Sequence, residues 1–223
     1  MAMVINKKEL IFQIERTETF TDPKIQLEQY TIDATSAVDI IYCAGFEFND
    51  INQKLIVDLG AGTGRLSIAS SFFNPIYILS VDIDFNTLYI LQKNIKKLNL
   101  ERKIFPICAD VKHFDISKIV LPRNLKITTI MNPPFGVQKK TADRKFLECA
   151  FLFSDVIYSV HLANKKVHNF ISNFVRKNNW LIDYVFPFDM LLEKSFQFHK
   201  YKTKQIKVNV YRFIKKEKSL KLN

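Results

Sequence analysis

Two spacings of apolar residues alternate along the chain, and together they predict an α/β fold. Short runs such as "KLIVDLG" (54–60) and "LKITTIMN" (125–132) are almost continuously apolar and end at turn-forming residues, as buried strands do. Longer stretches such as "NTLYILQKNIKKLNL" (86–100) repeat leucine and isoleucine every three or four residues, as helices with one buried face do. The two patterns follow one another along most of the chain.

The predicted elements form an open sheet with helices on both faces. Strands are expected at 54–60, 75–84, 103–110, 125–132 and 155–163, and helices at 7–16, 34–46, 63–73, 86–100, 143–153 and 165–180. Two late strands, 181–188 and 206–214, leave no room for a helix between them, so we expect the last strand to pair antiparallel. The pattern predicts a single domain over 1–223, with a helical N-terminal segment (1–48) and a basic C-terminal strand and tail (194–223).

Composition indicates the environment in which this fold is expected. The chain has 223 residues, of which 48% are hydrophobic and 25% are charged, enough for the core of one ordinary domain. No apolar run reaches the length of a membrane span, and charges come too early for a signal peptide. Three scattered cysteines without a C-x-x-C pair, and four histidines without metal-ligand spacing, favour a cytoplasmic protein that holds no metal.

Positive charge is concentrated near the C-terminus. The net charge is +11, and residues 194–223 hold ten lysines and arginines against one acid, Glu217. A local field of this sign favours a polyanionic partner such as nucleic acid. A solvated basic tail is the simpler alternative.

A glycine-rich loop, "DLGAGTGRL" (58–66), follows the first strand. Glycine occupies every second position, at Gly60, Gly62 and Gly64. Glycine lets the backbone turn tightly and approach a ligand closely at the carboxyl end of a strand. The third glycine of a dinucleotide fingerprint would fall on Arg65 or Ser67, and no triphosphate-binding G-x-x-x-x-G-K-[ST] is present, so both of those nucleotide sites are disfavoured.

Acidic residues end the second and third predicted strands. Asp82 lies 22 residues after Gly60 and could accept two ribose hydroxyls, as acids do in other nucleoside-binding α/β folds. Asp84 fits better as the N-cap of the following helix. Asp110 could accept the exocyclic amine of an adenine, or it could simply start a turn.

At these residues the chain resembles the class I S-adenosylmethionine-dependent methyltransferases. Their pattern is D-x-G-x-G-x-G, here from Asp58, with an acid at the second strand and an Asp at the third. The resemblance implies S-adenosyl-L-methionine as cofactor. It also implies a Rossmann-like open sheet of strand order 3-2-1-4-5-7-6 with strand seven antiparallel, which agrees with the interpretation of the late strands.

The fourth strand ends in "IMNPPFG" (130–136), a segment suited to holding a planar amine. Asn132 offers a side-chain carbonyl to an amine hydrogen, and Pro133 has a second carbonyl aimed by its fixed φ. Pro134 helps to stop the strand, and Phe135 offers a face on which a base can stack, worth roughly 1–3 kcal/mol. In-line displacement at a methyl carbon needs such orientation but neither a strong base nor a metal. The alternative is a proline-rich strand end with Phe135 in the core.

The segment resembles the N/D-P-P-Y/F signature of amino-methylating enzymes, which act on adenine N6, guanine N2, cytosine N4 or a protein glutamine amide. The signature alone leaves these substrates open. From about residue 7 to residue 214 the chain also resembles a small methyltransferase family, shared by archaea and eukaryotes, that methylates adenine N6 in small-subunit ribosomal RNA. The segments "EQY" (28–30), "NPPFG" (132–136) and "FHK" (198–200) occur in the order of that family.

The family resemblance implies further site residues. They are Gln29 and Tyr30 in the cofactor wall, Thr63 and Arg65 as loop contacts, and Val111 as a neighbour of the cofactor adenine. The chain departs from the family where Thr31 and Ile32 follow E-Q-Y in place of the usual Pro-Thr.

Two surfaces of the chain are expected to bind partners. In "FHKYKTK" (198–204), cations lie among aromatic residues, which suits a structured RNA. The expected RNA contacts are His199, Lys200, Lys202 and Lys204. The resemblance also implies a small zinc-binding activator protein. The third strand would be a sheet edge, and its Ile104, Phe105 and Ile107 are unusually apolar for that position, so a partner strand or a local loop should cover it.

The sequence therefore favours an enzyme that methylates adenine N6 in ribosomal RNA, with an RNA guanine-N2 methyltransferase as an alternative. A protein glutamine N5-methyltransferase would share the N-P-P-F motif but would have no use for the basic C-terminus. A catalytically silent RNA-binding module is disfavoured because the glycine loop and the motif are both intact.

Overall fold

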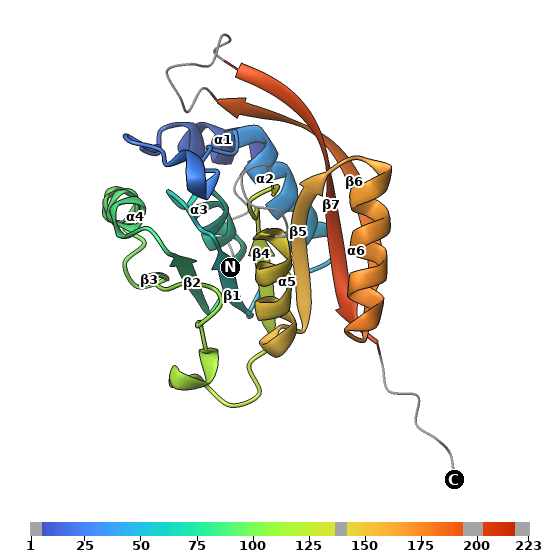
Figure 1. The fold of residues 1–223 in the computed structure, drawn as a ribbon. Coiled ribbons are helices and arrows are strands. Elements are labelled where there is room, and N and C mark those ends of the chain that lie inside the picture. Colours follow the sequence, from blue (N-terminus) through green and yellow to red (C-terminus); the bar gives the residue numbers. More distant parts are fainter. Residues whose placement is uncertain (1–5, 137–141, 194–202, 217–223) are drawn as a thin grey trace.

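A seven-stranded sheet forms the centre of the computed structural model, which describes residues 6–136, 142–193 and 203–216. The strands are β1 (Leu55–Leu59), β2 (Tyr77–Asp82), β3 (Ile104–Cys108), β4 (Ile127–Met131), β5 (Val156–Leu162), β6 (Trp180–Glu193) and β7 (Thr203–Lys215). Their order in the sheet is β3-β2-β1-β4-β5-β7-β6 (Figure 1). Strands β1 to β5 run parallel, and β7 is antiparallel to both β5 and β6. The predicted strand order and the antiparallel last strand are confirmed.

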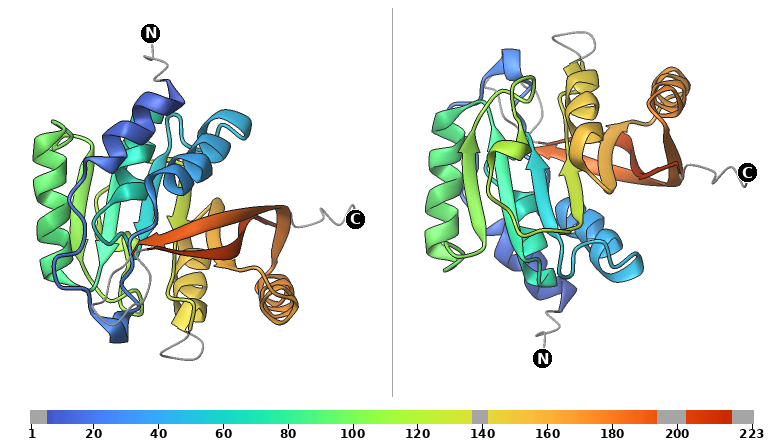
Figure 2. Two further views of the ribbon diagram at one scale, coloured as in Figure 1. Left: turned by 90° about the horizontal axis from the view of Figure 1, so that it is seen from above. Right: turned by 90° about the horizontal axis from the view of Figure 1, so that it is seen from below.

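Helices cover both faces of the sheet (Figure 2). They are α1 (Lys7–Glu15), α2 (Ala34–Tyr42), α3 (Arg65–Ser70), α4 (Phe85–Lys97), α5 (Ala142–Phe153) and α6 (Lys165–Lys177), with short helical turns η1 (Ile25–Leu27), η2 (Cys43–Glu47), η3 (Ser71–Phe73) and η4 (Ile116–Lys118). Alternate residues of β1 face opposite sides, so Ile56 packs in one cluster with α1 to α4, and Val57 packs in the other with α5 and α6. The longest helices in the described ranges, α4 and α6, have 13 residues each, and none is long and apolar enough to cross a membrane.

Most elements differ by a few residues from their predicted bounds, and three of these differences have a physical cause. The α-helical part of the predicted helix 34–46 ends at Tyr42 and continues as the π-helical turn η2. Helix α3 begins only at Arg65, because its N-cap Gly64 has a φ of 92° and still belongs to the glycine loop. Strand β6 continues to Glu193, well beyond residue 188, because it pairs with β7 along its whole length. Its Pro187 is tolerated because β6 lies at the edge of the sheet.

A buried polar network joins the loop before β1 to strands β5 and β7. The Tyr158 hydroxyl donates to Asp50 Oδ2 at 2.6 Å, and Arg212 donates to the same carboxylate from Nε at 2.8 Å and from Nη2 at 3.2 Å. Arg212 Nη1 also donates to Asp183 on β6, and the guanidinium lies 4.5 Å from the ring centroid of Phe48. Arg212 belongs to the cation-rich C-terminal stretch of the sequence, but its charge is neutralised inside the fold.

Candidate active site

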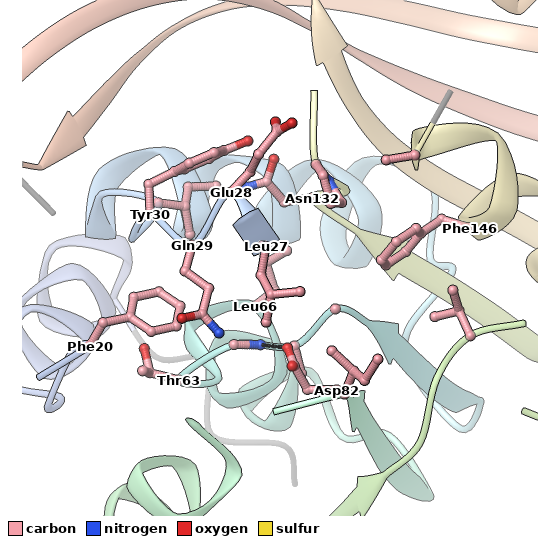
Figure 3. Close-up of a pocket in the computed structure, with 18 of the residues that line it drawn as sticks. Phe20, Leu27, Glu28, Gln29, Tyr30, Thr63, Leu66, Asp82, Asn132 and Phe146 are labelled. Atoms are coloured by element: carbon pink, nitrogen blue, oxygen red, sulfur yellow. Dashed lines mark hydrogen bonds between the residues drawn. The ribbon is translucent and has the colours of Figure 1, made fainter. Parts of the chain in front are cut away.

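A cavity of about 470 Å³ opens where the carboxyl ends of β1, β2 and β4 meet (Figure 3). The order of strands along the chain reverses between β1 and β4, and open α/β sheets bind ligands at such a switch point. The cavity volume lies within the usual range for small-molecule sites. Ten predicted cofactor residues line it, namely Gln29, Tyr30, Gly60, Gly62, Thr63, Gly64, Arg65, Asp82, Asp110 and Val111.

The glycine loop turns from β1 into α3 with backbone angles that L-residues avoid. Gly62 has a φ of 55° and Gly64 a φ of 92°. A Cβ at Gly62 would stand 3.1 Å from the ring of Phe20, and a Cβ at Gly64 would overlap Leu91. The loop is held against β2, because the backbone N–H groups of Gly60 and Ala61 donate to Val81 O at 2.8 and 3.0 Å. The bare backbone of the loop therefore forms a fixed wall of the cavity.

Asp82 ends β2 beside this loop. Its Oδ2 accepts from Gly62 N and its Oδ1 from Asp84 N, both at 2.9 Å. Burial raises the pKa of Asp82 above its ordinary value, and these two backbone donors counter part of that rise. Each carboxylate oxygen accepts from one backbone donor here and retains capacity for another. The residue therefore fits two ribose hydroxyls at the floor of the cavity.

Asp84 has the predicted role of N-cap for α4 and a second role that the sequence did not reveal. Its Oδ1 accepts from Asn86 N at 3.2 Å and from Lys24 Nζ at 2.8 Å, and its Oδ2 accepts from Gln29 Nε2 at 2.9 Å. Burial alone would raise its pKa, but the hydrogen bonds from Lys24 and Gln29 outweigh burial and hold the pKa below its ordinary value. Asp84 thus fastens the N-terminal chain to the sheet.

The chain segment that Asp84 fastens forms one side of the cavity, and we call residues 20–32 the N-terminal wall. Gln29 uses its amide to donate to Asp84, while its Oε1 accepts from Lys24 N at 2.7 Å. Just before the wall, Glu18 N donates to Asn94 Oδ1 at 2.8 Å, and Asn94 Nδ2 donates to Thr63 O at 3.1 Å. The wall is therefore tied to both α4 and the glycine loop, and Gln29 serves as a fixed part of it.

Asp110 starts a turn, as one of its two interpretations predicts, and it also lines the cavity. Its Oδ1 accepts from Lys112 N at 2.9 Å, and its carbonyl accepts from His113 N at 2.8 Å. Its Oδ2 lies 3.9 Å from Lys112 Nζ, beyond hydrogen-bond distance. That oxygen fits an adenine amine held next to Val111 and Ile83.

Asp58 lies beneath the glycine loop and does not line the cavity. Its Oδ2 accepts from the Ser67 hydroxyl at 2.6 Å, and Ser67 in turn bonds Ser80 at 2.7 Å. Burial raises the pKa of Asp58 to about 7, although the bonds from Ser67 oppose the rise. The first acid of the D-x-G-x-G-x-G pattern thus supports the loop from below.

The N-P-P-F segment leaves β4 at the opposite side of the cavity from Asp110. Asn132 and Pro134 line the cavity, whereas Pro133 and Phe135 do not. Asn132 Oδ1 is buried and has no hydrogen-bond partner among the described residues. The ring of Phe135 stacks on Tyr30, with centroids 5.3 Å apart and planes at 28°. One face of Phe135 is therefore already occupied within the protein.

Other lining residues were not found from the sequence. They include Phe20, Leu27, Ile83, Lys145 and Phe146. Phe146 lies on the helical face of α5, where an aromatic residue looks like an ordinary core position, yet its ring packs 2.9 Å from where a Gly60 Cβ would be. Phe20 lies in an irregular segment that has no periodic signal. Nothing local in the sequence marks either residue as part of a site.

The two predicted partner surfaces are described only in part. His199, Lys200 and Lys202 lie outside the described residues, and Lys204 lies in β7. Strand β3 is a sheet edge as predicted, but Ile104 is buried and Ile107 packs on the core, so Phe105, 39% exposed, is the apolar residue left at that edge.

Comparison with known proteins identifies the family. Residues 43–152 match the methyltransferase small domain family. An uncharacterized protein of Methanocaldococcus jannaschii is 35% identical, over 95% of this chain and 95% of its own length. The rRNA N(6)-adenosine-methyltransferase METTL5 of Danio rerio is 32% identical, over 92% of this chain and 97% of its own length.

A solved structure is similar over almost the whole chain. The crystal structure of PH1948 from Pyrococcus horikoshii, a candidate RNA methyltransferase, is 34% identical with a TM-score of 0.83, covering 96% of this chain and 99% of that one. The class I methyltransferase fold implies S-adenosyl-L-methionine as cofactor, and the bare glycine loop and the Asp82 carboxylate beside it fit that group. The chain therefore belongs to the family of small-domain, S-adenosyl-L-methionine-dependent methyltransferases that includes METTL5 of Danio rerio.

Proposed function

We propose that this methyltransferase acts on RNA and methylates the N6 amine of an adenine in small-subunit ribosomal RNA. The observation that carries the proposal is the side-chain carbonyl of Asn132, which is buried at the cavity without a partner. Buried acceptors are normally satisfied, so an unpaired one at a ligand edge is suited to a hydrogen of the substrate. The similarity to the Danio rerio rRNA N(6)-adenosine-methyltransferase METTL5 supports adenine N6 in rRNA as that substrate.

The chain itself has to hold the cofactor and orient the amine. When bound, S-adenosyl-L-methionine supplies an electrophilic methyl group on a positively charged sulfur. Asp82 would accept the ribose hydroxyls and Asp110 the adenine amine, while the glycine loop would allow close approach of the methionine part. Asn132 would accept one amine hydrogen, so that the nitrogen lone pair faces the methyl group. The Pro133 carbonyl is the proposed acceptor for the other hydrogen, although Pro133 itself does not line the cavity.

Binding of RNA is supported by the charge of the C-terminal region. The ten cations of residues 194–223 include Arg212, which is paired within the fold, so the remaining lysines would carry the phosphate contacts. His199, Lys200, Lys202 and Lys204 are the proposed contacts. Affinity for RNA should then fall as salt rises, since phosphate contacts release counterions. A protein glutamine N5-methyltransferase would need no such field.

The proposal is tested by mass spectrometry of nucleosides and of protein hydrolysates after incubation with ribosomal RNA, protein extract and labelled cofactor. We expect N6-methyladenine in RNA with the wild-type enzyme and none with Asn132→Ala, while the dissociation constant for the cofactor stays unchanged. The matched control, Asn169→Ala on the exposed face of α6, should retain full turnover. Label in glutamine or in guanine N2, or unchanged turnover by Asn132→Ala, would refute the assignment.

A small zinc-binding activator protein remains part of the proposal. Strand β3 leaves one row of backbone groups unpaired at the sheet edge, and Phe105 beside it packs edge-on against Tyr77 with centroids 5.6 Å apart. An added strand would satisfy that edge. An isolated chain that is soluble, monomeric and fully active would end this part of the proposal.

A further inference from the structure

We infer that the hydroxyl of Tyr30 donates a hydrogen bond to a ring nitrogen of the target base, beside the amine that Asn132 orients. This inference rests on the proposed adenine substrate and adds a residue that selects it. It assigns to the Tyr30 side chain a second task besides the cofactor-wall position that the family resemblance implies.

The first observation is that the hydroxyl has nothing to bind within the protein. Tyr30 lines the cavity, and its hydroxyl oxygen is buried without a hydrogen-bond partner among the residues that the structure describes. A buried tyrosine hydroxyl usually finds a partner, because burying it unpaired is costly. Asn132 Oδ1, at the same cavity, is also buried without a hydrogen-bond partner among the described residues. The cavity thus presents one unpaired donor and one unpaired acceptor.

The second observation is that these two groups occupy the same end of the cavity. Figure 3 shows Tyr30 and Asn132 together at one end, with Thr63 and Asp82 at the other. The ring of Tyr30 is fixed by stacking on Phe135, which follows Asn132 by three residues. The Tyr30 hydroxyl therefore lies at the Asn132 end of the cavity, away from the proposed ribose site at Asp82.

The hydroxyl keeps its proton in this environment. Burial raises the pKa of Tyr30 well above its ordinary value, and the negative charge of Glu28 adds a smaller rise. The group therefore acts as a donor at neutral pH. It has no role as a base, and it leaves acceptance of the amine hydrogen to Asn132.

Adenine carries the complementary groups. Its N6 amine donates, and the neighbouring ring nitrogens N1 and N7 both accept. RNA-binding sites read splayed-out bases along these edges. A donor from Tyr30 and an acceptor from Asn132 would match the amine together with one of the two ring nitrogens. The pair would hold the base in plane while the amine faces the methyl donor.

The test combines Tyr30→Phe with modified RNA. The adenosine that the wild-type enzyme methylates is first located in the RNA. Short RNAs are then made with adenosine, 1-deazaadenosine or 7-deazaadenosine at that position. Tyr30→Phe keeps the ring and its stacking, so the cofactor dissociation constant should not change. On adenosine, kcat/KM should fall about tenfold, the loss of one buried hydrogen bond. On one of the two deaza RNAs, variant and wild type should react at equal rates, which identifies the nitrogen.

Several results separate this inference from the proposed function. If the wild-type enzyme methylates no adenine, both fall together. If it methylates adenine and Tyr30→Phe matches wild type, or slows all three RNAs by one common factor, only the inference is overturned. A weaker cofactor complex in Tyr30→Phe would likewise overturn it, because the hydroxyl would then contact the cofactor. The control Tyr89→Phe, exposed on α4, should match wild type throughout.

Discussion

Replacing Arg212 with alanine should destabilise the fold by about 3 kcal/mol without weakening RNA binding by the folded protein. Arg212 gives three hydrogen bonds to carboxylates, two to Asp50 and one to Asp183, and its side chain is only 13% exposed. Its removal would leave the Asp50 carboxylate, 10% exposed, without a cation. Breaking one side of a buried ion pair costs roughly 3–5 kcal/mol. The lower end applies because the Tyr158 hydroxyl still donates to Asp50.

Urea denaturation measures this free energy of unfolding, with Lys216→Ala as the matched control. Lys216 is an exposed cation of the same C-terminal stretch, so its loss should change stability by less than about 0.5 kcal/mol. Adding Asp50→Asn to Arg212→Ala should recover part of the lost stability, because no unpaired charge would remain buried. Filter binding at a temperature where all variants are folded measures RNA affinity. The reasoning is refuted if Arg212→Ala is as stable as wild type and binds RNA much more weakly.

Two further predictions concern the glycine loop and its support. In the folded protein the pKa of Asp58 is about 7 against an ordinary 3.8, so the folded state binds more protons between these values and stability falls as pH rises through that window. Urea denaturation at about pH 5 and pH 8 should show a stability difference of roughly 2.5–3 kcal/mol from this residue, and Asp58→Asn should remove it; an unchanged difference would argue against a buried proton on Asp58. Gly62→Ala places a side chain at a φ of 55° and 3.1 Å from Phe20, and calorimetry should show a roughly tenfold weaker cofactor complex. Unchanged affinity would mean that the loop backbone does not approach the cofactor.

Much of the sheet could be predicted because its signals are local. The five parallel strands are short apolar runs, and Asp84 caps α4 where a turn acid precedes a helical pattern. The glycine loop and Asp82 follow from the same logic, since parallel strands bring their carboxyl ends to one edge. The hydrophobic and polar pattern thus predicts that the glycine loop and Asp82 lie together at the floor of the cavity.

The remaining walls of the cavity depend on contacts between distant residues. Lys24 bonds Asp84 across 60 positions, and Glu18 bonds Asn94 across 76. Neither contact is visible in the spacing of apolar residues, and the segment between α1 and α2 has no helical or strand-like spacing. Phe135 is predicted to offer a stacking face to a base, and Tyr30 stacks on one of the two faces of its ring. Which face of an aromatic ring stays open is decided by tertiary packing, which the local sequence does not encode.

The N-terminal wall also constrains when a growing chain can bind its cofactor. Lys24 and Gln29 leave the ribosome before Asp84, the side chain that fastens them. Until α4 has been made, the wall has no anchor and the glycine loop is open on that side. Asn132 and the first turn of α5 close the other side later still. A cavity walled on both sides is therefore present only in chains that already carry the N-P-P-F segment and the first turn of α5.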